Sequence, residues 1–449
     1  MKKSKSDFKF TGDPLRSWGR YPYHPQNPNK IYWRDEITGK LETVSVKNGD
    51  TLAFGNGRSY GDSCLAKSGQ VIHTKSLNRF IAFDMESGII KVESGVTIEE
   101  ILNVSIPKGW FVSVTPGTKY VTVGGAIAND VHGKNHHEKG TFGCHVTKFG
   151  LIRSGEREVT CSKNENVELF NATIGGLGLT GIVSWAEIKL IKIKSSLIEK
   201  TTMPFGSLDE FFEVSNKNDE KNDYSVAWID CLAKGKKLGR GIYFTGNHCK
   251  NGELKIPNKK KISVPFSPPF SLINKFSLKI FNNLYHNLHL KKDDEKSNYD
   301  DFFYPLDHIN NWNKIYGTKG FQQYQCVIPK EKARDGIYKI LKTISKARSG
   351  SFLAVLKNFG NIQSPGLLSF PMEGTSLALD FAQGDYLKEL FGNLDKIVVK
   401  FGGRLYPAKD AHMSGEDFKK FYPKWRDLEK LRDKSLNSRF WDRVTGDVC

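Results

Sequence analysis

Short stretches of apolar residues alternate with polar ones along the first part of the chain. They include IIKVESG (89–95), VTKFGLI (146–152) and GIVSWAEIKLI (181–191), which are rich in β-branched residues and typical of strands. Between them, TIEEILNVSIPKG (97–109) has apolar residues at helical spacing, and Thr97 followed by Glu100 predicts an N-terminal capping box. Strands alternating with short helices predict an α/β or α+β domain over residues 1–195.

The pattern changes after Ile193, where glycine turns thin out and longer apolar runs begin. Examples are YSVAWID (224–230), FQQYQCVIP (321–329) and TSLALDFAQ (375–383). These runs predict a second, sheet-based domain over 196–399. We expect the chain to return to the first domain over 400–449, where a charged, mostly helical pattern begins at Ser414.

One stretch, 251–300, interrupts this second domain and is rich in Lys, Pro and Asn. Within it, Ile273, Phe276, Ile280 and Leu284 recur at helical spacing and predict an amphipathic helix. Two interpretations remain open: a surface helix that docks on its own domain, or a mobile or membrane-facing segment that lies in a bilayer interface.

Composition limits the classes of function. The chain has 449 residues, 38% of them hydrophobic, with a formal net charge of +18, so it suits a folded protein of two domains. A basic balance is compatible with nucleic acid, an anionic membrane surface or phosphorylated ligands. The lysines are scattered, and no zinc-finger spacing, RNP-like motif or heptad pattern accompanies them, so we expect no nucleic-acid partner.

Cysteine usage and the amino terminus bear on the compartment. The seven cysteines are odd in number and form no CxxC pair, which argues against a disulfide framework and structural zinc and favours a reducing compartment. MKKSKSDFKFTGDP has no apolar signal-peptide core, and no apolar run approaches the ~18 residues of a spanning helix. We expect a cytoplasmic protein, with peripheral contact at the inner face of a membrane left open.

Glycine-rich loops follow several predicted strands. They are FGNGRSYGDS (54–63), TPGTKYVTVGGAIAND (115–130) and IGGLGLTGIV (174–183). Consecutive backbone N–H groups in such loops bind anions, and glycine lets a ligand approach the backbone closely. The first loop fits neither the Rossmann fingerprint nor the P-loop. Three such loops in one domain indicate a large ligand with several phosphates or rings, and FAD fits that description.

The segment VGGAIANDVHGKNHH (123–137) holds a cluster of histidines. HGKNHH lacks the HExxH spacing, and no acidic residue is placed as a metal ligand, so we expect no metal. The glycine half can start a helix whose backbone N–H groups point at a phosphate. His136 and His137 are expected to be loop structure.

These loops, together with PGT (116–118), FQQYQCVIP, SFLAVLKNFG (351–360) and FGGRLYPAKDA (401–411), resemble the vanillyl-alcohol-oxidase/PCMH superfamily. Within it they are most similar to the decaprenylphosphoryl-β-D-ribose 2′-oxidase family. The resemblance implies an α+β fold, in which a PCMH-type FAD-binding domain made from both chain ends carries an inserted sheet-based substrate domain. Some relatives bind flavin covalently through GxGHS. Here Arg58 takes the histidine's place, so we expect non-covalent FAD.

The resemblance also implies a set of cofactor-binding residues on the glycine loops and the carboxyl-terminal return. They are Gly55, Asn56, Gly57, Arg58, Ser59, Tyr60, Gly61, Asp62, Pro116, Gly117, Thr118, Thr122, Gly124, Gly125, Ala128, Asn129, Val131, His132, Gly133, Gly178, Gly181, Ile182, Tyr406 and Lys409.

For catalysis the resemblance implies Lys409, as a cation that stabilises negative charge at the flavin or substrate oxygen, and His132 beside the sugar. The implied reaction oxidises a furanose 2′-hydroxyl of a polyprenyl-phosphate pentose to a ketone, which a short-chain dehydrogenase/reductase partner then reduces. A soluble aldonolactone or sugar alcohol is the alternative substrate. The implied substrate-binding residues are Lys134, Gln323, Gln325, Lys357, Tyr60 and Ser376.

Two positions depart from the mycobacterial pattern. Ala378 stands where those enzymes have a cysteine, so a thiol-directed covalent inhibitor would find no target there. Ser376 replaces an asparagine, so we expect sugar recognition to differ in detail at this position.

Overall fold

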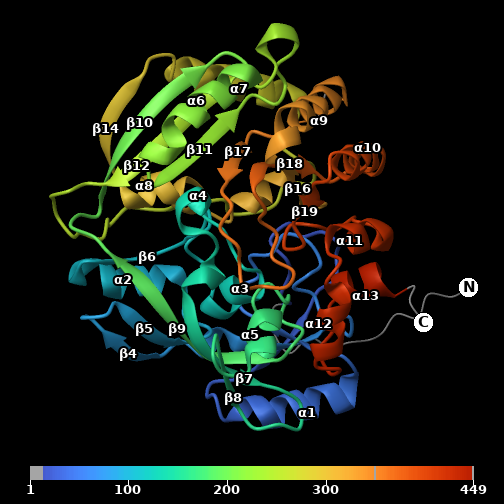
Figure 1. The fold of residues 1–449 in the computed structure, drawn as a ribbon. Helices are drawn as coiled ribbons and strands as arrows, with labels where there is room; N and C mark the ends of the chain where they lie inside the picture. The colour runs from blue at the N-terminus through green and yellow to red at the C-terminus, as the bar shows by residue number, and fades with distance from the viewer. Residues whose placement is uncertain (1–13, 348–349, 447–449) are drawn as a thin grey trace, which may run out of the picture.

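The computed structural model describes residues 14–347 and 350–446 and has two layers stacked one on the other (Figure 1), referred to below as the lower and upper parts. Two small sheets lie in the lower part, and a single large sheet lies in the upper part. Both ends of the described chain lie in the lower part. The division into domains 1–195 with 400–449, and 196–399, remains our interpretation of this arrangement.

The lower part begins with a parallel sheet in the order β1-β3-β2. An antiparallel sheet follows in the order β4-β5-β9-β7-β8, and β6 pairs with β9. The strands are β1 (Asn27–Lys30), β2 (Leu52–Phe54), β3 (Gln70–His73), β4 (Phe80–Asp84), β5 (Ile89–Glu93), β6 (Trp110–Val112), β7 (Val146–Ile152), β8 (Val159–Ser162) and β9 (Ile182–Lys192). The helices are α1 (Glu36–Asn48), α2 (Ile98–Ser105), α3 (Val123–Ala128), α4 (His136–Lys139) and α5 (Val167–Thr173).

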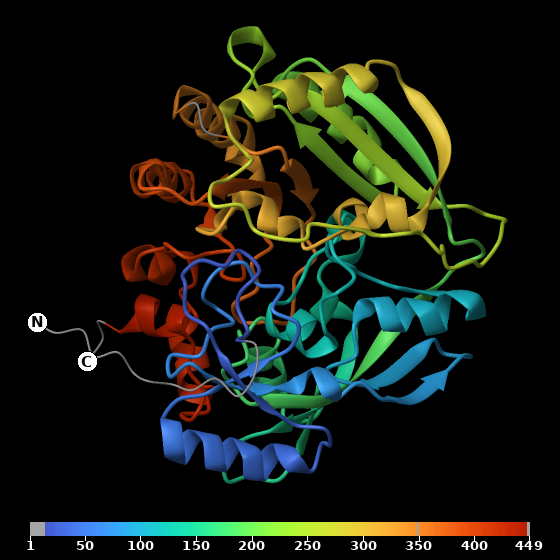
Figure 2. The same ribbon diagram turned by 180° about the vertical axis from the view of Figure 1, so that it is seen from behind.

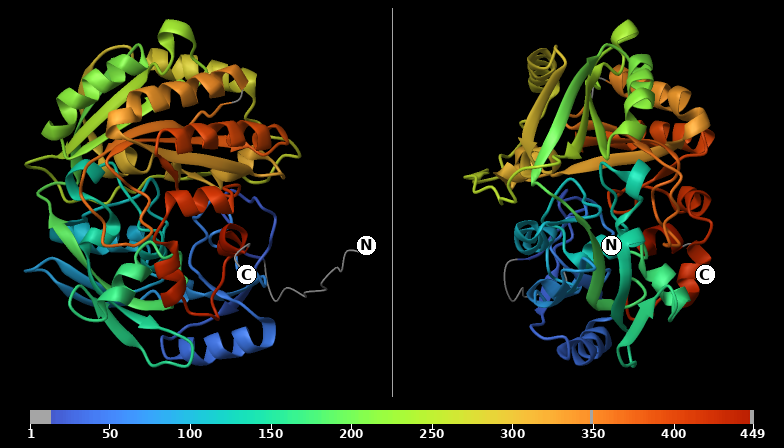
Figure 3. Two further views of the ribbon diagram at one scale, coloured as in Figure 1. Left: turned by 45° about the vertical axis from the view of Figure 1, so that its right-hand side comes forward. Right: turned by 60° about the vertical axis from the view of Figure 1, so that its left-hand side comes forward.

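The upper part is an antiparallel sheet in the order β14-β10-β12-β11-β17-β18-β16-β19. Its strands are β10 (Leu197–Phe205), β11 (Tyr224–Ile229), β12 (Gly241–His248), β14 (Asp293–Asn298), β16 (Phe321–Pro329), β17 (Ala354–Phe359), β18 (Gly374–Ala382) and β19 (Arg404–Leu405). α6 (Leu208–Asn218), α9 (Ala333–Ala347) and α10 (Tyr386–Lys400) cover one face (Figure 3). Leu377 and Leu379 point into that core, so the alternate residues of β18 face the lower part.

The carboxyl terminus returns to the lower part through α11 (Gly415–Phe421), α12 (Trp425–Leu431) and α13 (Arg439–Thr445). β19 still pairs with β16, so the large sheet extends to Leu405 before the chain crosses back. Thr51 then pairs with Leu436, and Ala66 with Ser438. Segments almost four hundred residues apart in the chain thus share backbone hydrogen bonds.

Several predicted elements are confirmed. The capping box forms at α2, where the Thr97 hydroxyl accepts a hydrogen bond from the Glu100 N–H and the Glu100 carboxylate accepts one from the Thr97 N–H. The strand patterns at 89–95, 146–152 and 181–191 correspond to β5, β7 and β9. The α+β prediction is also confirmed.

The 251–300 stretch contains β13 (Ile262–Ser263), α7 (Lys275–Leu288), β14 and the start of α8 (Tyr299–Phe303). Its helical prediction is confirmed, and α7 does dock on its own domain, through the buried Leu278 and Asn282. The apolar residues that predicted the helix do not make this contact, because Phe276, Ile280 and Leu284 are exposed. Docking therefore uses the opposite side of the helix. Figure 2 shows α7 lying over the large sheet.

No helix among residues 14–347 and 350–446 is long and apolar enough to cross a membrane.

Candidate active site

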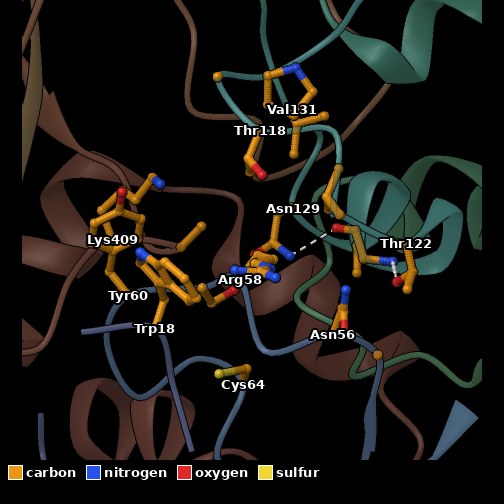
Figure 4. Close-up of a pocket in the computed structure, with 18 of the residues that line it drawn as sticks. Trp18, Asn56, Arg58, Tyr60, Cys64, Thr118, Thr122, Asn129, Val131 and Lys409 are labelled. Carbon is orange, nitrogen blue, oxygen red and sulfur yellow. Dashed lines mark hydrogen bonds between the residues drawn. The ribbon is translucent and has the colours of Figure 1, made fainter. Parts of the chain in front are cut away.

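A cavity of about 340 Å³ lies between the two parts of the molecule, where the three glycine loops meet the open face of the large sheet. Figure 4 shows Lys409, Tyr60 and Trp18 gathered at one side of it, and Thr122 and Asn56 at the other, with Arg58 between. Glycine loops therefore form one end of the cavity, and charged and aromatic side chains form the other. Its size suits a ligand site.

At the glycine-loop end of the cavity, the backbone packs too closely for a side chain at some positions. The 54–61 loop leaves β2 and passes so close to Thr122 that a Cβ on Gly55 would overlap the Thr122 hydroxyl. Thr122 caps α3 by accepting a hydrogen bond from the Gly125 N–H at 3.2 Å. Gly117 has open space where its Cβ would be. The loop backbones are thus free of side chains on the cavity side, as close contact with a pyrophosphate requires.

Nearly all the residues expected to hold FAD line this cavity. Those that do are Gly55, Asn56, Gly57, Arg58, Ser59, Tyr60, Pro116, Gly117, Thr118, Thr122, Gly124, Gly125, Ala128, Asn129, Val131, His132, Gly133, Gly178, Gly181, Ile182, Tyr406 and Lys409.

Three predicted site residues are not in the lining. Gly61 sits behind it, where a Cβ would overlap the Asp410 carbonyl. Asp62 is buried and paired with Arg443 at 2.8 Å, so it fastens the loop to α13. Ser376 lies beneath Gln325, whose side-chain nitrogen is 3.4 Å from the serine hydroxyl. Their contacts are with other parts of the protein, so a direct role toward a ligand is not supported for them.

Arg58 stands where a covalently linked flavoprotein would have its histidine. Its guanidinium lies over the rings of Trp18, at 4.2 Å, and Tyr120, at 5.1 Å. Burial lowers the pKa of Arg58, and its Nε has no hydrogen-bond partner among the described residues. A buried cation with an unused donor suits an anionic ligand.

Lys409 enters the cavity on the loop that follows β19. That loop crosses the first glycine loop, because the Tyr60 N–H donates to the Ala408 carbonyl at 2.9 Å. The Lys409 ammonium then lies 3.7 Å from the centre of the Tyr60 ring. Burial lowers the pKa of Lys409; Asp380 opposes this shift and Lys357 adds to it.

Asp380 is a fully buried carboxylate on β18, facing the same side as Ser376 and Ala378. Its Oδ1 accepts a hydrogen bond from Gln323 Nε2 at 2.6 Å, while its Oδ2 has no partner among the described residues. Burial raises the pKa of Asp380. The hydrogen bond from Gln323 and the charge of Lys409 lower it. The sequence analysis missed this residue, although its alternation with Ser376 and Ala378 along the strand was a usable signal.

His132 lies at the centre of the substrate end. Lys357 Nζ is 3.3 Å from its Nδ1, and an ammonium can only donate, so Nδ1 accepts and the ring proton is on Nε2. The Gln325 amide meets Nε2 at 3.0 Å, its oxygen and nitrogen being interchangeable by a half turn. Burial is the main cause that lowers the pKa of His132 well below its usual value. The charges of Lys357, His136 and Lys409 lower it further. Burial thus favours the neutral imidazole, and the Lys357 contact favours the tautomer with its proton on Nε2.

Two further lysines make this end of the cavity cationic. Burial lowers the pKa of Lys357 to about 8, and burial with Lys357 lowers the pKa of Lys134 to about 7. Lys134 donates to the Phe302 and Phe303 carbonyls at 2.7 and 3.2 Å, which ties the histidine loop to α8. An anion bound here would be stabilised by both lysines and would favour their charged forms.

The three histidines are not equivalent. His136 is buried against Phe359, with ring centres 4.5 Å apart, and has no hydrogen-bond partner among the described residues. His137 lies 2.9 Å from the Asn222 carbonyl. Neither lines the cavity. Across residues 14–347 and 350–446, no group of His, Cys, Asp and Glu could hold a metal ion.

Several lining residues were not expected from the sequence. Trp18 comes from the amino-terminal segment, and Leu306, Asp307 and Trp312 come from the stretch before β16. Asp307 Oδ2 accepts a hydrogen bond from the Lys119 N–H at 2.8 Å, which ties this stretch to the second glycine loop. Nothing in the local sequence around Trp18 marks its contact with Arg58.

The comparisons with known proteins agree with this geometry. Residues 35–162 match a family model described as an FAD binding domain. The chain is 35% identical to decaprenylphosphoryl-β-D-ribose oxidase of Mycolicibacterium smegmatis over 444 residues, which cover 96% of this chain and 95% of that protein. It is 24% identical to L-gulonolactone oxidase of Bos taurus over 48% of each chain. It is also 30% identical to cytokinin dehydrogenase 3 of Arabidopsis thaliana over 34% of this chain and 29% of that protein.

The fold, the glycine-lined cavity and the domain match define an FAD-dependent oxidoreductase with a PCMH-type FAD-binding domain. Within that class, the chain belongs to the decaprenylphosphoryl-β-D-ribose oxidase family.

Proposed function

We propose that this enzyme oxidises the 2′-hydroxyl of a ribofuranose carried on a polyprenyl phosphate, giving the 2′-keto sugar. The observation that carries the proposal is the cluster of His132, Gln325, Lys357 and Lys409 between the glycine loops and the large sheet. The near-full-length likeness to an oxidase with that substrate in its name supports it. Bound FAD supplies the two-electron acceptor for the hydride that leaves C2′, and the proton of the 2′-hydroxyl passes to a basic side chain of the cluster or to water.

The protein's own side chains bind and orient the sugar in this proposal. His132 presents a fixed neutral ring, and Gln325 beside it can bind a neighbouring sugar oxygen. Lys357 and Lys134 supply the charge that the sugar phosphate needs. Lys409 contacts Tyr60 near the crossing of the two loops, where an ammonium would stabilise the negative charge of the reduced cofactor.

The apolar part of the pocket suits the lipid. Leu306, Leu353, Val355 and Ala378 line the cavity beside the cationic groups. An apolar wall next to buried lysines favours a ligand with a hydrocarbon chain attached to a phosphate. A soluble aldonolactone would use neither feature, although L-gulonolactone oxidase is a partial relative.

The wider setting is also included in the proposal. The keto sugar would be reduced on its other face by a short-chain dehydrogenase/reductase partner subunit, so that the pair converts ribose to arabinose for cell-wall arabinan. The oxidase would work in the cytoplasm at the inner face of the membrane. Cofactor reoxidation would use a quinone or another acceptor.

The test is anaerobic reduction of the bound flavin. Ribosyl-phosphopolyprenol is expected to bleach the flavin absorbance, whereas the same phosphopolyprenol without sugar, the matched control, is not. Bleaching by free aldonolactones but not by the lipid-linked sugar would contradict the proposal and favour the soluble alternative.

A further inference from the structure

Large apolar side chains are exposed along one continuous stretch of the upper part, residues 254–292. On α7 they form the row Phe276, Ile280, Leu284 and Leu288, with Phe276 74% and Leu288 79% exposed. The loop before the helix adds Ile262, Phe266, Phe270 and Leu272, which are also exposed. We call these eight side chains the apolar row. Scattered exposed hydrophobics are ordinary, but a concentration like this marks an interaction surface.

The exposure is not the result of a loosely attached helix. The other side of α7 is anchored by the buried Leu278 and by Asn282, whose Nδ2 donates to Asp230 Oδ1 at 2.7 Å. Tyr285 packs on Trp228 of β11, with ring centres 4.8 Å apart. Because this side is fixed to the sheet, the apolar row is held outward.

The charge within the stretch that carries the apolar row is positive, although Glu253 and Asp293–Glu295 lie at its two ends. Residues 254–292 contain eight lysines and no aspartate, glutamate or arginine. Lys255, Lys259 and Lys261 pair with carboxylates outside the stretch. The remaining lysines form no ion pair within the described part of the chain; they are Lys260, Lys275, Lys279, Lys291 and Lys292. Unpaired lysines beside exposed apolar side chains are complementary to an anionic lipid surface.

The same stretch borders the substrate cavity. β13 pairs in parallel with β15 (Ile309–Asn310), which lies between the cavity-lining Asp307 and Trp312. The Leu272 N–H donates to the Ile315 carbonyl at 2.9 Å. The right-hand view of Figure 3 shows α7 and the preceding loop projecting from the same side of the upper part. The outer side of the cavity wall is thus covered by the loop that carries half of the apolar row.

We propose that residues 254–292 form a membrane-docking surface, with the apolar row entering the headgroup region of an anionic bilayer and the lysines binding its phosphates. A bilayer is favoured over a folded partner because the apolar side chains project from a helix and a loop and the charged residues among them are all lysines. The further consequence, that docking brings a lipid-linked substrate to the cavity, rests on the proposed function.

The test is flotation of the FAD-loaded enzyme with vesicles of phosphatidylcholine containing phosphatidylglycerol. The wild-type enzyme is expected to float with these vesicles, less so at high salt, and much less with phosphatidylcholine alone. F276Q/L284Q is expected to bind at least about tenfold more weakly, since both side chains would be buried in lipid. V46Q/M85Q, which changes exposed apolar residues on the lower part, is the matched control and is expected to float like the wild type.

Binding equally well to neutral vesicles, or unchanged flotation of F276Q/L284Q, would overturn the proposal. So would a mutation-sensitive dimer in sedimentation equilibrium without flotation, which would assign the surface to a second copy of the chain. Oxidation of a short-chain, water-soluble ribosyl phosphate distinguishes failure of the docking proposal from failure of the proposed function. F276Q/L284Q is expected to oxidise it at the wild-type rate; failure of the wild type to oxidise it would count against the proposed function, not the docking.

Discussion

Lys409 is held between a carboxylate that favours its charged form and a second lysine that disfavours it. Burial lowers its pKa, Asp380 raises it, and Lys357 lowers it. An ammonium in this position costs free energy in the empty site and gains it when negative charge develops nearby. The arrangement suits a group that acts during the reaction more than one that holds the fold.

Lys409→Ala is expected to keep FAD and to lower the rate of flavin reduction by substrate about 10²- to 10³-fold, as when one electrostatic contact to the reacting charge is removed. Stopped-flow absorbance would measure the rate, and the flavin-to-protein ratio would measure retention. Lys388→Ala, at an exposed lysine of α10, is the control. Unchanged reduction by Lys409→Ala would remove the role assigned to it.

The pH dependence of the flavin-reduction rate is expected to depend on Asp380. Its charge raises the pKa of Lys409, so Asp380→Asn lowers that pKa further, and Lys409 loses its proton at lower pH. If the ammonium is the active form, the alkaline limb of the flavin-reduction rate moves to lower pH. A pH profile of the reduction rate checks this, with exposed Asp385→Asn as the control. A purely structural role would instead lower the rate similarly at every pH.

At the scale of elements, α13 fastens the cofactor loop to the loop that carries Lys409. Arg443 pairs with Asp62 at 2.8 Å and with Asp410 at 2.9 Å, and both carboxylates are buried. One guanidinium thus bridges buried carboxylates on two loops, and His412 also contacts Asp410 at 3.0 Å. The site at the far end of the cavity depends on this contact even though Arg443 does not line it.

Arg443→Met is expected to lower the free energy of unfolding by about 3 to 5 kcal/mol, because it leaves the buried carboxylate of Asp62 without its cationic partner. The bound flavin should decrease with it. Urea unfolding followed by fluorescence measures the first, and absorbance measures the second. Arg439→Met, at an exposed position of the same helix, should change neither; equal stability of Arg443→Met and the wild type would contradict this account.

Elements were predictable where the signal is local. Thr97 and Glu100 specified the start of α2, because a capping box involves only four consecutive residues. The orientation of α7 was not predictable, since both of its sides carry apolar residues: Phe276 and Leu284 on one, Leu278 and Tyr285 on the other. Periodicity shows that a helix has an apolar side but not what that side contacts.

Within the site, the loops were predictable and some partners were not. Lys409, His132 and Lys357 could be placed by resemblance, and the cavity brings them together. Trp18 meets Arg58 from forty residues away, and Arg443 meets Asp62 from the other end of the chain. Such contacts depend on tertiary packing, which no short pattern encodes.

At the scale of the whole molecule, a shared hydrophobic core joins the lower and upper parts. It includes Leu52 and Phe54 of the lower part, Leu377 and Phe391 of the upper part, and Trp441 of the return. The interface between the parts is therefore continuous with the interior of each. This argues for cooperative unfolding in spite of the two-domain interpretation.

Thermal unfolding is accordingly expected to show one transition, in which flavin fluorescence appears at the temperature where far-UV circular dichroism is lost. Excess FAD should raise that temperature, by mass action on the folded state alone. Because Arg58 replaces a linking histidine, all flavin should leave the unfolded chain. Two separated transitions, or flavin that stays on the denatured protein, would contradict these expectations.

The interlock of Arg443 with Asp62 and Asp410 also bears on how the enzyme is made. The glycine loops are synthesised early, but Arg443, which fastens the first of them, is synthesised 381 residues after Asp62. Even though domains generally fold during synthesis, the contact that joins the two loops cannot form until Arg443 has left the ribosome. A nascent chain that stops before Arg443 is therefore expected to hold FAD less well than one that includes it.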